Sequence, residues 1–317
     1  MSTALIDRLR SGDARALARA ISTVENRAPG WAELLKALFP YTGKARVIGL
    51  TGAPGSGKST LVDRLAKHYR NKEENKTVGI IAVDPTSPYT GGAILGDRIR
   101  MQDHYSDPGI FIRSMATRGS LGGLARATAD TATVLDASGC DVIMIETVGV
   151  GQDEVDIVRL ADVTIVILVP GMGDDVQTIK AGIMEIADIF IINKSDHEGA
   201  ERVEREIRAM QSLAARNDRW TPPIVKTVAS EGVGTEELAK AIAAYETYLK
   251  RDDLVFKKNV ENWQERLVEM LRDAMLEKAR AQMDGDSLER YATEIAEHKR
   301  DPYSLVEEIV GTLTRNT

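Results

Sequence analysis

Short apolar runs, separated by longer segments of helical character, dominate the chain from residue 45 onward. Each run is six to eight residues long and rich in Val, Ile and Leu. The runs cover residues 45–51, 77–84, 109–114, 141–146, 162–169, 188–193 and 223–228. Near-continuous apolar strands are typical of a parallel sheet that helices cover on both faces. The pattern therefore predicts an α/β domain with a mostly parallel sheet.

Both ends of the chain have helical periodicity and no strand signal. Residues 3–40 are interpreted as two helices, over 4–26 and 31–40, with Pro29 and Gly30 between them. Further helices are expected over residues 236–249, 253–283, 286–299 and 303–314. We therefore expect an N-terminal helical segment, a central domain and a C-terminal helical extension, over residues 1–42, 43–250 and 251–317.

Composition narrows the class of protein. Hydrophobic residues make up 43% of the 317 residues and charged residues 28%, as in soluble globular proteins. The net charge of −7, with no block of Lys and Arg, argues against nucleic acid or an anionic membrane as partner. No apolar run reaches membrane-spanning length. Cys140 is the single cysteine, which excludes an internal disulfide and fits a cytoplasmic protein.

The sequence GAPGSGKS, residues 52–59, is a complete G-x-x-x-x-G-K-[ST] motif between an apolar run and a helical segment. In such a P-loop the backbone N–H groups surround phosphate oxygens, and Lys58 brings its charge to the β- and γ-phosphates. A Gly-rich turn without this function is the alternative. The predicted phosphate-binding residues are Gly52, Ala53, Pro54, Gly55, Ser56, Gly57, Lys58, Ser59 and Thr60.

Four oxygen-bearing side chains are candidates for a magnesium site, since Mg²⁺ prefers oxygen ligands. The Ser59 hydroxyl belongs to the P-loop, and Asp84 and Glu146 each end a predicted strand. Asp97 follows in the loop after Asp84. The alternative is that such acids cap a helix or solvate a loop. We favour the metal site because strand ends in a parallel sheet meet at the nucleotide edge.

A second motif predicts the base that is bound. Asn193-Lys194-Ser195-Asp196 follows an apolar strand downstream of the P-loop, as the guanine-reading N-K-x-D motif does. The Asp196 carboxylate can accept hydrogen bonds from guanine N1–H and the exocyclic amine, whereas adenine would leave it unpaired. Lys194 can cover the base, and Asn193 can hold the loop together. The backbone of Val228, Ala229 and Ser230 is expected to close over the base.

The order of these motifs differs from that of Ras-like proteins, because Glu146 stands in the third motif where those carry the Asp of D-x-x-G. The chain instead resembles the MeaB/ArgK GTPases, chaperones of adenosylcobalamin-dependent acyl-CoA mutases such as methylmalonyl-CoA mutase. The resemblance spans nearly the whole chain. It rests on GAPGSGKST, VDPTSPYTGGAILGDRIRM, RSMATRGSLGGLA, ETVGVGQDEVDI, QTIKAGIMEIADIFIINKSD and HKRDPYSLVEEIV.

The resemblance implies the fold of signal-recognition and MinD-type P-loop GTPases, and homodimers held largely by the C-terminal helices. It places Ser59, Asp84, Asp97 and Glu146 on the family's magnesium positions. It also implies a switch that couples hydrolysis to the mutase, over Asp174, Asp175, Gln177 and Lys180. The loop at Val228 departs from relatives, which often begin it with Ser, although backbone contacts can survive that change.

The implied function is a GTP-hydrolysing chaperone that gates adenosylcobalamin loading and protects or reactivates a partner acyl-CoA mutase. GTP or GDP and Mg²⁺ are the expected ligands, and hydrolysis is expected to be slow without the partner. The catalytic candidates are Lys58, Asp97, Glu146 and Gln152. Gln152 could position the attacking water or be an ordinary loop residue. An intrinsic arginine finger cannot be chosen among Arg98, Arg113 and Arg118.

The sequence also leaves alternative functions to consider. A metallocentre-insertion GTPase shares the nucleotide motifs but typically needs Cys and His clusters, whereas Cys140 is alone and the four histidines are scattered. An amino-acid transport-associated NTPase or kinase is an old label for this family, and a protein-targeting GTPase would need a Met-rich domain. The C-terminal helices could also be a purely structural appendage. The identity of the client mutase does not follow from the chain.

Overall fold

The structure is a computed structural model that describes residues 3–71, 73–84, 107–116, 123–147, 160–171, 187–213, 220–251, 253–283 and 286–315. Its contacts divide the chain into two compact units, Met1–Arg251 and Asp252–Thr317. The first unit holds the sheet, and the second consists of helices. We describe each unit by itself.

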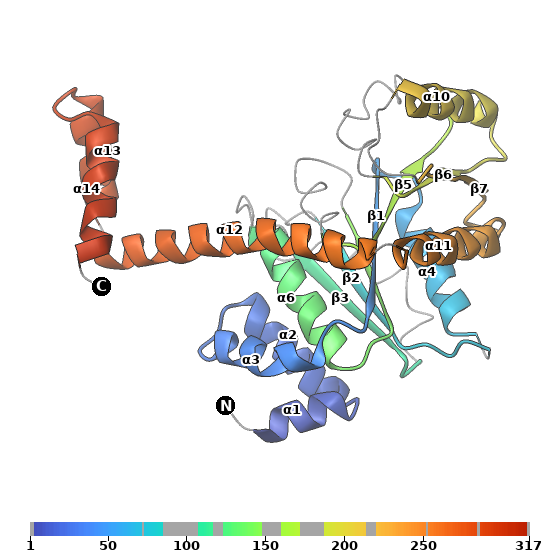
Figure 1. The fold of residues 1–317 in the computed structure, drawn as a ribbon, viewed down its shortest axis with the longest axis horizontal. Coiled ribbons are helices and arrows are strands. Elements are labelled where there is room, and N and C mark those ends of the chain that lie inside the picture. Colours follow the sequence, from blue (N-terminus) through green and yellow to red (C-terminus); the bar gives the residue numbers. More distant parts are fainter. Residues whose placement is uncertain are drawn as a thin grey trace. The chain divides into compact units, whose positions relative to one another are not determined.

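A seven-stranded parallel sheet forms the centre of the first unit, in the order β3-β2-β4-β1-β5-β6-β7 (Figure 1). The strands are β1 (Arg46–Gly52), β2 (Val78–Asp84), β3 (Ile110–Ala116), β4 (Val142–Glu146), β5 (Val163–Leu168), β6 (Ile189–Asn193) and β7 (Ile224–Thr227). Each strand coincides with one predicted apolar run to within two residues at either end. The predicted α/β class with a parallel sheet is thus confirmed.

Strand β1 lies in the middle of the sheet, between β4 and β5. Leu50 of β1 pairs with Glu146 of β4, and Glu146 pairs with Ala82 of β2. All strands run the same way, so the turn after β1, the end of β4 and the end of β6 meet at one edge of the sheet. This edge collects the groups that the sequence assigns to nucleotide binding.

Helices cover the sheet because its strands are apolar on both faces. Ile81 and Val83 of β2 pack in one cluster with α6 (Gly123–Ala137), while the alternate residues Ile80 and Ala82 are also buried. Since successive strand side chains point to opposite faces, a second layer must cover the other face. There, α4 (Lys58–Tyr69) contacts β1, β2 and β4, and α11 (Thr235–Leu249) packs beside α4. Helix α10 (Ala200–Leu213) contacts β6.

The N-terminal helices differ from the prediction. The single helix expected over residues 4–26 is two helices, α1 (Thr3–Arg10) and α2 (Ala14–Glu25). Gly12 adopts a φ of 82°, and the Asp13 carboxylate caps α2 by accepting from the N–H groups of Arg15 and Ala16. A left-handed glycine followed by an Asp N-cap ends one helix and starts the next. Helix α3 (Trp31–Leu38) and a 3₁₀ turn (Phe39–Tyr41) follow.

These N-terminal helices pack on α6 as part of the first unit (Figure 1). Leu9, Ile21 and Leu34 are fully buried in the same cluster as the apolar side chains of α6. Arg113 of β3 forms an ion pair with Glu25 of α2, which joins this strand to the N-terminal helices. Cys140 is also buried there, and burial raises the pKa of its thiol to about 11.

The second unit consists of α12 (Leu254–Gln282), α13 (Ser287–Ala296) and α14 (Pro302–Arg315). Helix α14 packs against α12, and the side chains of Ala279 and Leu305 are buried in this unit. The Asp301 carboxylate caps the start of α14 by accepting a hydrogen bond from the N–H of Ser304. This hydrogen bond is the main cause that lowers the pKa of the Asp301 carboxyl group. Three helices occupy the region where the sequence predicted three, and their predicted ends agree to within three residues.

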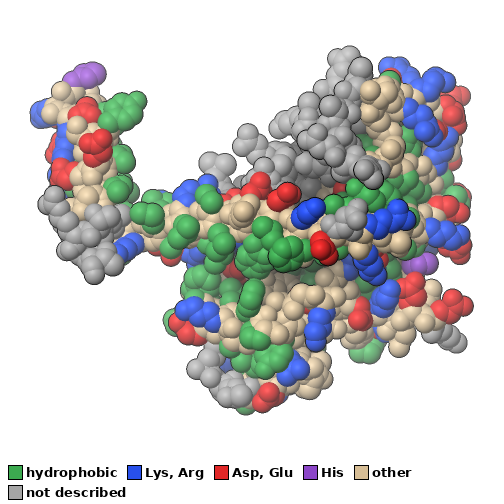
Figure 2. Space-filling model, in the orientation of Figure 1, with side chains coloured by type: hydrophobic (Ala, Val, Ile, Leu, Met, Phe, Trp, Pro, Cys, Tyr) green, Lys and Arg blue, Asp and Glu red, His purple; other side chains and the backbone are tan. Residues whose placement is uncertain are grey.

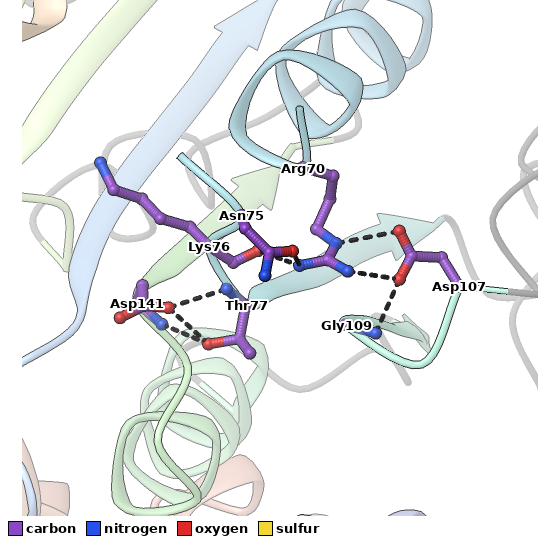
Figure 3. Close-up of polar contacts among 7 residues, drawn as sticks. All are labelled: Arg70, Asn75, Lys76, Thr77, Asp107, Gly109 and Asp141. Carbon is purple, nitrogen blue, oxygen red and sulfur yellow. Dashed lines mark hydrogen bonds and ion pairs between the residues drawn. The ribbon is translucent and has the colours of Figure 1, made fainter. Parts of the chain in front are cut away.

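A polar network joins the end of α4 to the sheet edge opposite the nucleotide edge (Figure 3). Arg70 donates two hydrogen bonds to the Asp107 carboxylate, at 2.9 and 2.8 Å, and one to the Lys76 carbonyl. Its guanidinium lies against Gly109, where a Cβ would come within 2.2 Å of the Arg70 Cζ atom. Asp107 accepts from the Gly109 N–H as well. Arg70 therefore fastens the segment before β3 to the P-loop helix.

We expect Arg70→Ala to lower the free energy of unfolding by about 1–3 kcal/mol, because it leaves the partly buried Asp107 carboxylate without its bidentate partner. Urea denaturation followed by circular dichroism measures the change. Lys67→Ala removes an exposed cation from the same helix and is the matched control, with an expected change within about 0.5 kcal/mol. An equal effect of both variants would contradict the anchoring role of Arg70.

Candidate nucleotide site

The turn that the sequence assigns to phosphate binding lies between β1 and α4. Gly52 and Gly57 have φ values of 152° and 93°, backbone conformations that L side chains rarely adopt. A Cβ at Gly52 would lie 2.4 Å from the Ile167 carbonyl oxygen, and one at Gly57 would lie 2.2 Å from Asn193 Nδ2. Glycine is thus required at both positions, and the backbone approaches β5 and β6 closely.

Lys58 is buried at the first position of α4. Its Nζ donates to the carbonyls of Gly52 and Ala53, at 2.8 and 3.1 Å. The ammonium group therefore lies over the turn that the motif assigns to phosphate. If a phosphate oxygen were bound there, the Lys58 ammonium would exchange two carbonyl acceptors for a negatively charged one. A hydrogen bond to a charged acceptor is stronger.

Ser59 and Glu146 meet beside this turn. The Ser59 hydroxyl donates to Glu146 Oε1 at 2.6 Å, and Glu146 is buried at the end of β4. This contact joins residues 87 positions apart, which the sequence had linked only through the supposed magnesium site. A hydroxyl and a carboxylate side by side supply the oxygen donors that Mg²⁺ prefers.

The remaining acidic and switch candidates fall largely outside the described residues. Asp84 ends β2 at the same sheet edge as Glu146, but its side chain is not described. No group of three potential Asp, Glu, His or Cys metal ligands occurs within the described part of the chain. The candidates that lie wholly outside the described residues are Asp97, Gln152, Asp174, Asp175, Gln177 and Lys180.

Asn193 connects the two halves of the site. Its Nδ2 donates to the Ser56 carbonyl of the P-loop at 2.7 Å. Its Oδ1 accepts from the Thr227 hydroxyl at 3.0 Å and from the Ala229 N–H at 3.1 Å. The side chain is buried, so these bonds are shielded from water. The sequence predicted that Asn193 holds a loop together, but not that its amide reaches the P-loop.

Lys194 and Asp196 follow at the nucleotide edge. Lys194 has a φ of 55°, which turns the chain sharply after β6. The Asp196 side chain is 53% exposed, and His197 Nε2 lies 3.8 Å from its Oδ2. A carboxylate with this exposure can accept two donors from a ligand without first breaking a buried contact.

Residues 228–233, here called the base loop, follow β7. Val228 and Val233 form an isolated antiparallel bridge, and the Glu231 N–H donates to the Val228 carbonyl. Arg64 of α4 donates to the carbonyls of Ala229 and Ser230 from the other side. Sequence reasoning missed Arg64, because the residues in contact are 165 positions apart and no motif includes it.

Two buried polar groups, one in the P-loop and one just before it, were not anticipated from the motif. The Ser56 hydroxyl is fully buried and has no hydrogen-bond partner among the described residues. Thr51, also fully buried, accepts from Thr147 at 3.1 Å across β1 and the end of β4. Ser56 lies within the turn, and Thr51 lies in β1 next to it.

Comparison with known proteins gave concordant matches. The family model for methylmalonyl-CoA mutase-associated GTPase MeaB matches residues 17–284. A putative GTPase of Pyrococcus abyssi is 49% identical over 97% of this chain and 96% of its own length. A putative GTPase of Pyrococcus horikoshii is 48% identical over 97% and 98%. A solved structure described as LAO/AO transport system kinase superposes with a TM-score of 0.72, at 27% identity over 99% of each chain.

Within the described part of the chain, no helix has both the length and the apolar character needed to cross a membrane.

Replacing Asp196 tests whether this edge reads guanine. Asp196→Asn exchanges one acceptor for a donor, so GTP affinity is expected to fall by about ten- to a hundredfold. Xanthosine triphosphate should bind more tightly to the variant than to the original chain, because xanthine carries a carbonyl where guanine carries the amine. Isothermal titration calorimetry measures both affinities.

Glu198→Gln, at an exposed acid two residues further on, is the matched control. Unchanged GTP affinity in Asp196→Asn would remove Asp196 from the base site.

Proposed function

This chain belongs to the MeaB family of methylmalonyl-CoA mutase-associated GTPases, and we propose that it is a GTP-hydrolysing chaperone of an adenosylcobalamin-dependent acyl-CoA mutase. In this role it would gate adenosylcobalamin loading and protect or reactivate the partner, which is methylmalonyl-CoA mutase or a close relative. The observation that carries the proposal is the family match over residues 17–284, which includes both nucleotide motifs.

The nucleotide chemistry of the proposal follows from the arrangement of side chains. Phosphoryl transfer to water depends mainly on positioning and on stabilising charge. Lys58 would release the Gly52 and Ala53 carbonyls and neutralise the β- and γ-phosphates. Asn193 would keep the P-loop in register with the base loop while Asp196 accepts from the guanine edge. The same fold would thus fix both ends of the nucleotide.

The residues at the phosphate turn fit a magnesium ion. Ser59 and Glu146 would hold it, because their oxygen atoms already lie 2.6 Å apart at the end of β4. Asp84 and Asp97 are the further proposed ligands from the family resemblance. When bound, the ion would neutralise charge that develops on the phosphate oxygens. Glu146 would also keep the Ser59 hydroxyl oriented toward the phosphate turn.

Coupling to the mutase is proposed for the segment that contains Asp174, Asp175, Gln177 and Lys180, and water activation for Gln152. The segment begins just after β5 and ends just before β6, which carries Asn193. A conformational change in this segment could couple nucleotide binding to partner binding, and partner binding to nucleotide binding, as in other switch segments. Slow hydrolysis by the free chain would follow if the partner orders these residues.

Homodimerisation through the C-terminal helices is the remaining part of the proposal. Exposed apolar side chains gather along α12 (Figure 2). Five of them recur with alternating spacings of four and three residues, the heptad pattern of paired helices. These side chains are 38–69% exposed, although helices normally bury such a stripe. The stripe consists of Phe256, Val260, Trp263, Leu267 and Met270. A second copy of α12 would cover it.

The chaperone role is tested by measuring the GTPase rate of the chain with a panel of purified acyl-CoA mutases. One member of the panel should bind the chain and raise the rate, because ordering the switch supplies groups that the free chain lacks. Lys180→Ala should keep GDP affinity and lose most of this stimulation, whereas Lys180→Arg should retain it. Stimulation by no mutase would reject the chaperone role and leave a GTPase with another partner.

The transport-kinase alternative, suggested by the description of one similar structure, makes a different prediction in the same assay. A kinase would move the γ-phosphate of the nucleotide to an acceptor molecule. A GTPase instead releases it as inorganic phosphate in amounts equal to GDP.

Dimerisation is tested by placing a charge in the apolar stripe. Leu267→Glu should convert the dimer into a monomer in sedimentation equilibrium, since a buried unpaired carboxylate costs several kcal/mol. Glu265→Gln alters the same helix away from the stripe and should leave the dimer intact. A monomeric original chain, or a dimer that survives Leu267→Glu, would contradict this interface.

A further inference from the structure

Helix α4 contacts the base loop with its second turn, in addition to carrying the P-loop lysine at its first. Arg64 Nε donates to the Ala229 carbonyl at 2.9 Å, and its Nη2 donates to the Ser230 carbonyl. Among the described residues, no carboxylate forms an ion pair with Arg64. The guanidinium therefore donates hydrogen bonds to two successive carbonyl groups of one loop.

This contact fixes the direction of the peptide between Ala229 and Ser230. The described chain contains no cis peptide bond, so the carbonyl and the N–H of this peptide point in opposite directions. With the Ala229 carbonyl turned toward Arg64, the Ser230 N–H points to the side away from α4. A guanidinium on two adjacent carbonyls holds that orientation more firmly than a single neutral donor would.

Four N–H groups around Ser230 in the loop are already engaged. The N–H groups of Val228, Glu231 and Gly232 donate to carbonyls within the loop, at 3.1, 3.0 and 3.3 Å. The Ala229 N–H donates to Asn193 Oδ1. Among the described residues, the Ser230 N–H has no acceptor, and Ser230 is exposed. The Ser230 N–H is thus a backbone donor that the loop can present to a ligand.

We propose that Arg64 is a positioning residue that aims the Ser230 N–H at the oxygen on C6 of the purine base. This inference rests on the guanine site proposed above and adds a second determinant to it. Asp196 would read the N1 and C2 side of the base, and the loop held by Arg64 would read C6. Adenine carries an amino group at C6, which is a hydrogen-bond donor. It could not accept from the Ser230 N–H, so adenine would be rejected.

The experiment compares two ligands of the full chain by calorimetry: GDP and 6-thio-GDP, in which a weakly accepting sulfur replaces the C6 oxygen. The original chain should prefer GDP. Arg64→Ala should weaken GDP binding by about tenfold, the value of one hydrogen bond, and should abolish the preference over 6-thio-GDP. Arg64→Lys should restore part of the preference, since an ammonium can still reach a carbonyl.

Lys67→Ala, which removes another cation from α4, is the control and should keep both affinities. A preference for GDP that survives in Arg64→Ala would overturn the positioning role, whatever happens to absolute affinity. Equal weakening of both ligands together with a lower melting temperature would overturn it too, as a purely structural effect.

A second variant covers the case in which Arg64→Ala does not fold. Ser230→Pro removes the proposed donor and leaves Arg64 in place. It should lose the preference for GDP over 6-thio-GDP to the same extent, and a retained preference would overturn the proposal. An original chain that binds GDP and 6-thio-GDP equally would overturn it as well. An original chain that binds no GDP would instead reject the guanine site itself.

Discussion

The buried amide of Asn193 is the contact on which the nucleotide edge depends. It hydrogen-bonds to the P-loop through the Ser56 carbonyl, to β7 through Thr227 and to the base loop through Ala229. An unsatisfied buried polar group costs about 1–3 kcal/mol, so the three elements are stable only together. Gly57 belongs to the same arrangement, because any Cβ there would collide with the amide. The phosphate and base regions are therefore one structural unit.

The charged and hydroxyl groups of Lys58 and Ser59 in the P-loop are already paired with protein atoms. Lys58 donates to two carbonyls of its own turn, and Ser59 donates to Glu146. A nucleotide therefore exchanges existing hydrogen bonds for stronger charged ones rather than adding contacts to free groups. Such exchange keeps buried charges satisfied in both states and makes affinity smaller than the sum of the contacts.

Much of the fold was predictable because its signals are local. Seven apolar runs became seven parallel strands, since a strand buried on both faces needs apolar residues at nearly every position. The break between α1 and α2 was missed, although Gly12 and Asp13 are recognisable signals for ending one helix and starting another. The apolar residues on both sides of the break follow one helical period, and this pattern favoured a single helix. The packing of the N-terminal helices on α6 had no local signal at all.

The sequence by itself determined the chemistry of the site. Lys58, Ser59 and the motif from Asn193 to Asp196 were predicted as site residues because phosphate and guanine binding require particular residues at fixed spacing. Only the tertiary structure decided how they meet. It placed Glu146 against Ser59, joined Asn193 to the P-loop and brought Arg64 to the base loop. These contacts depend on strand order and helix packing between residues 87 to 165 positions apart, and local sequence does not encode such distances.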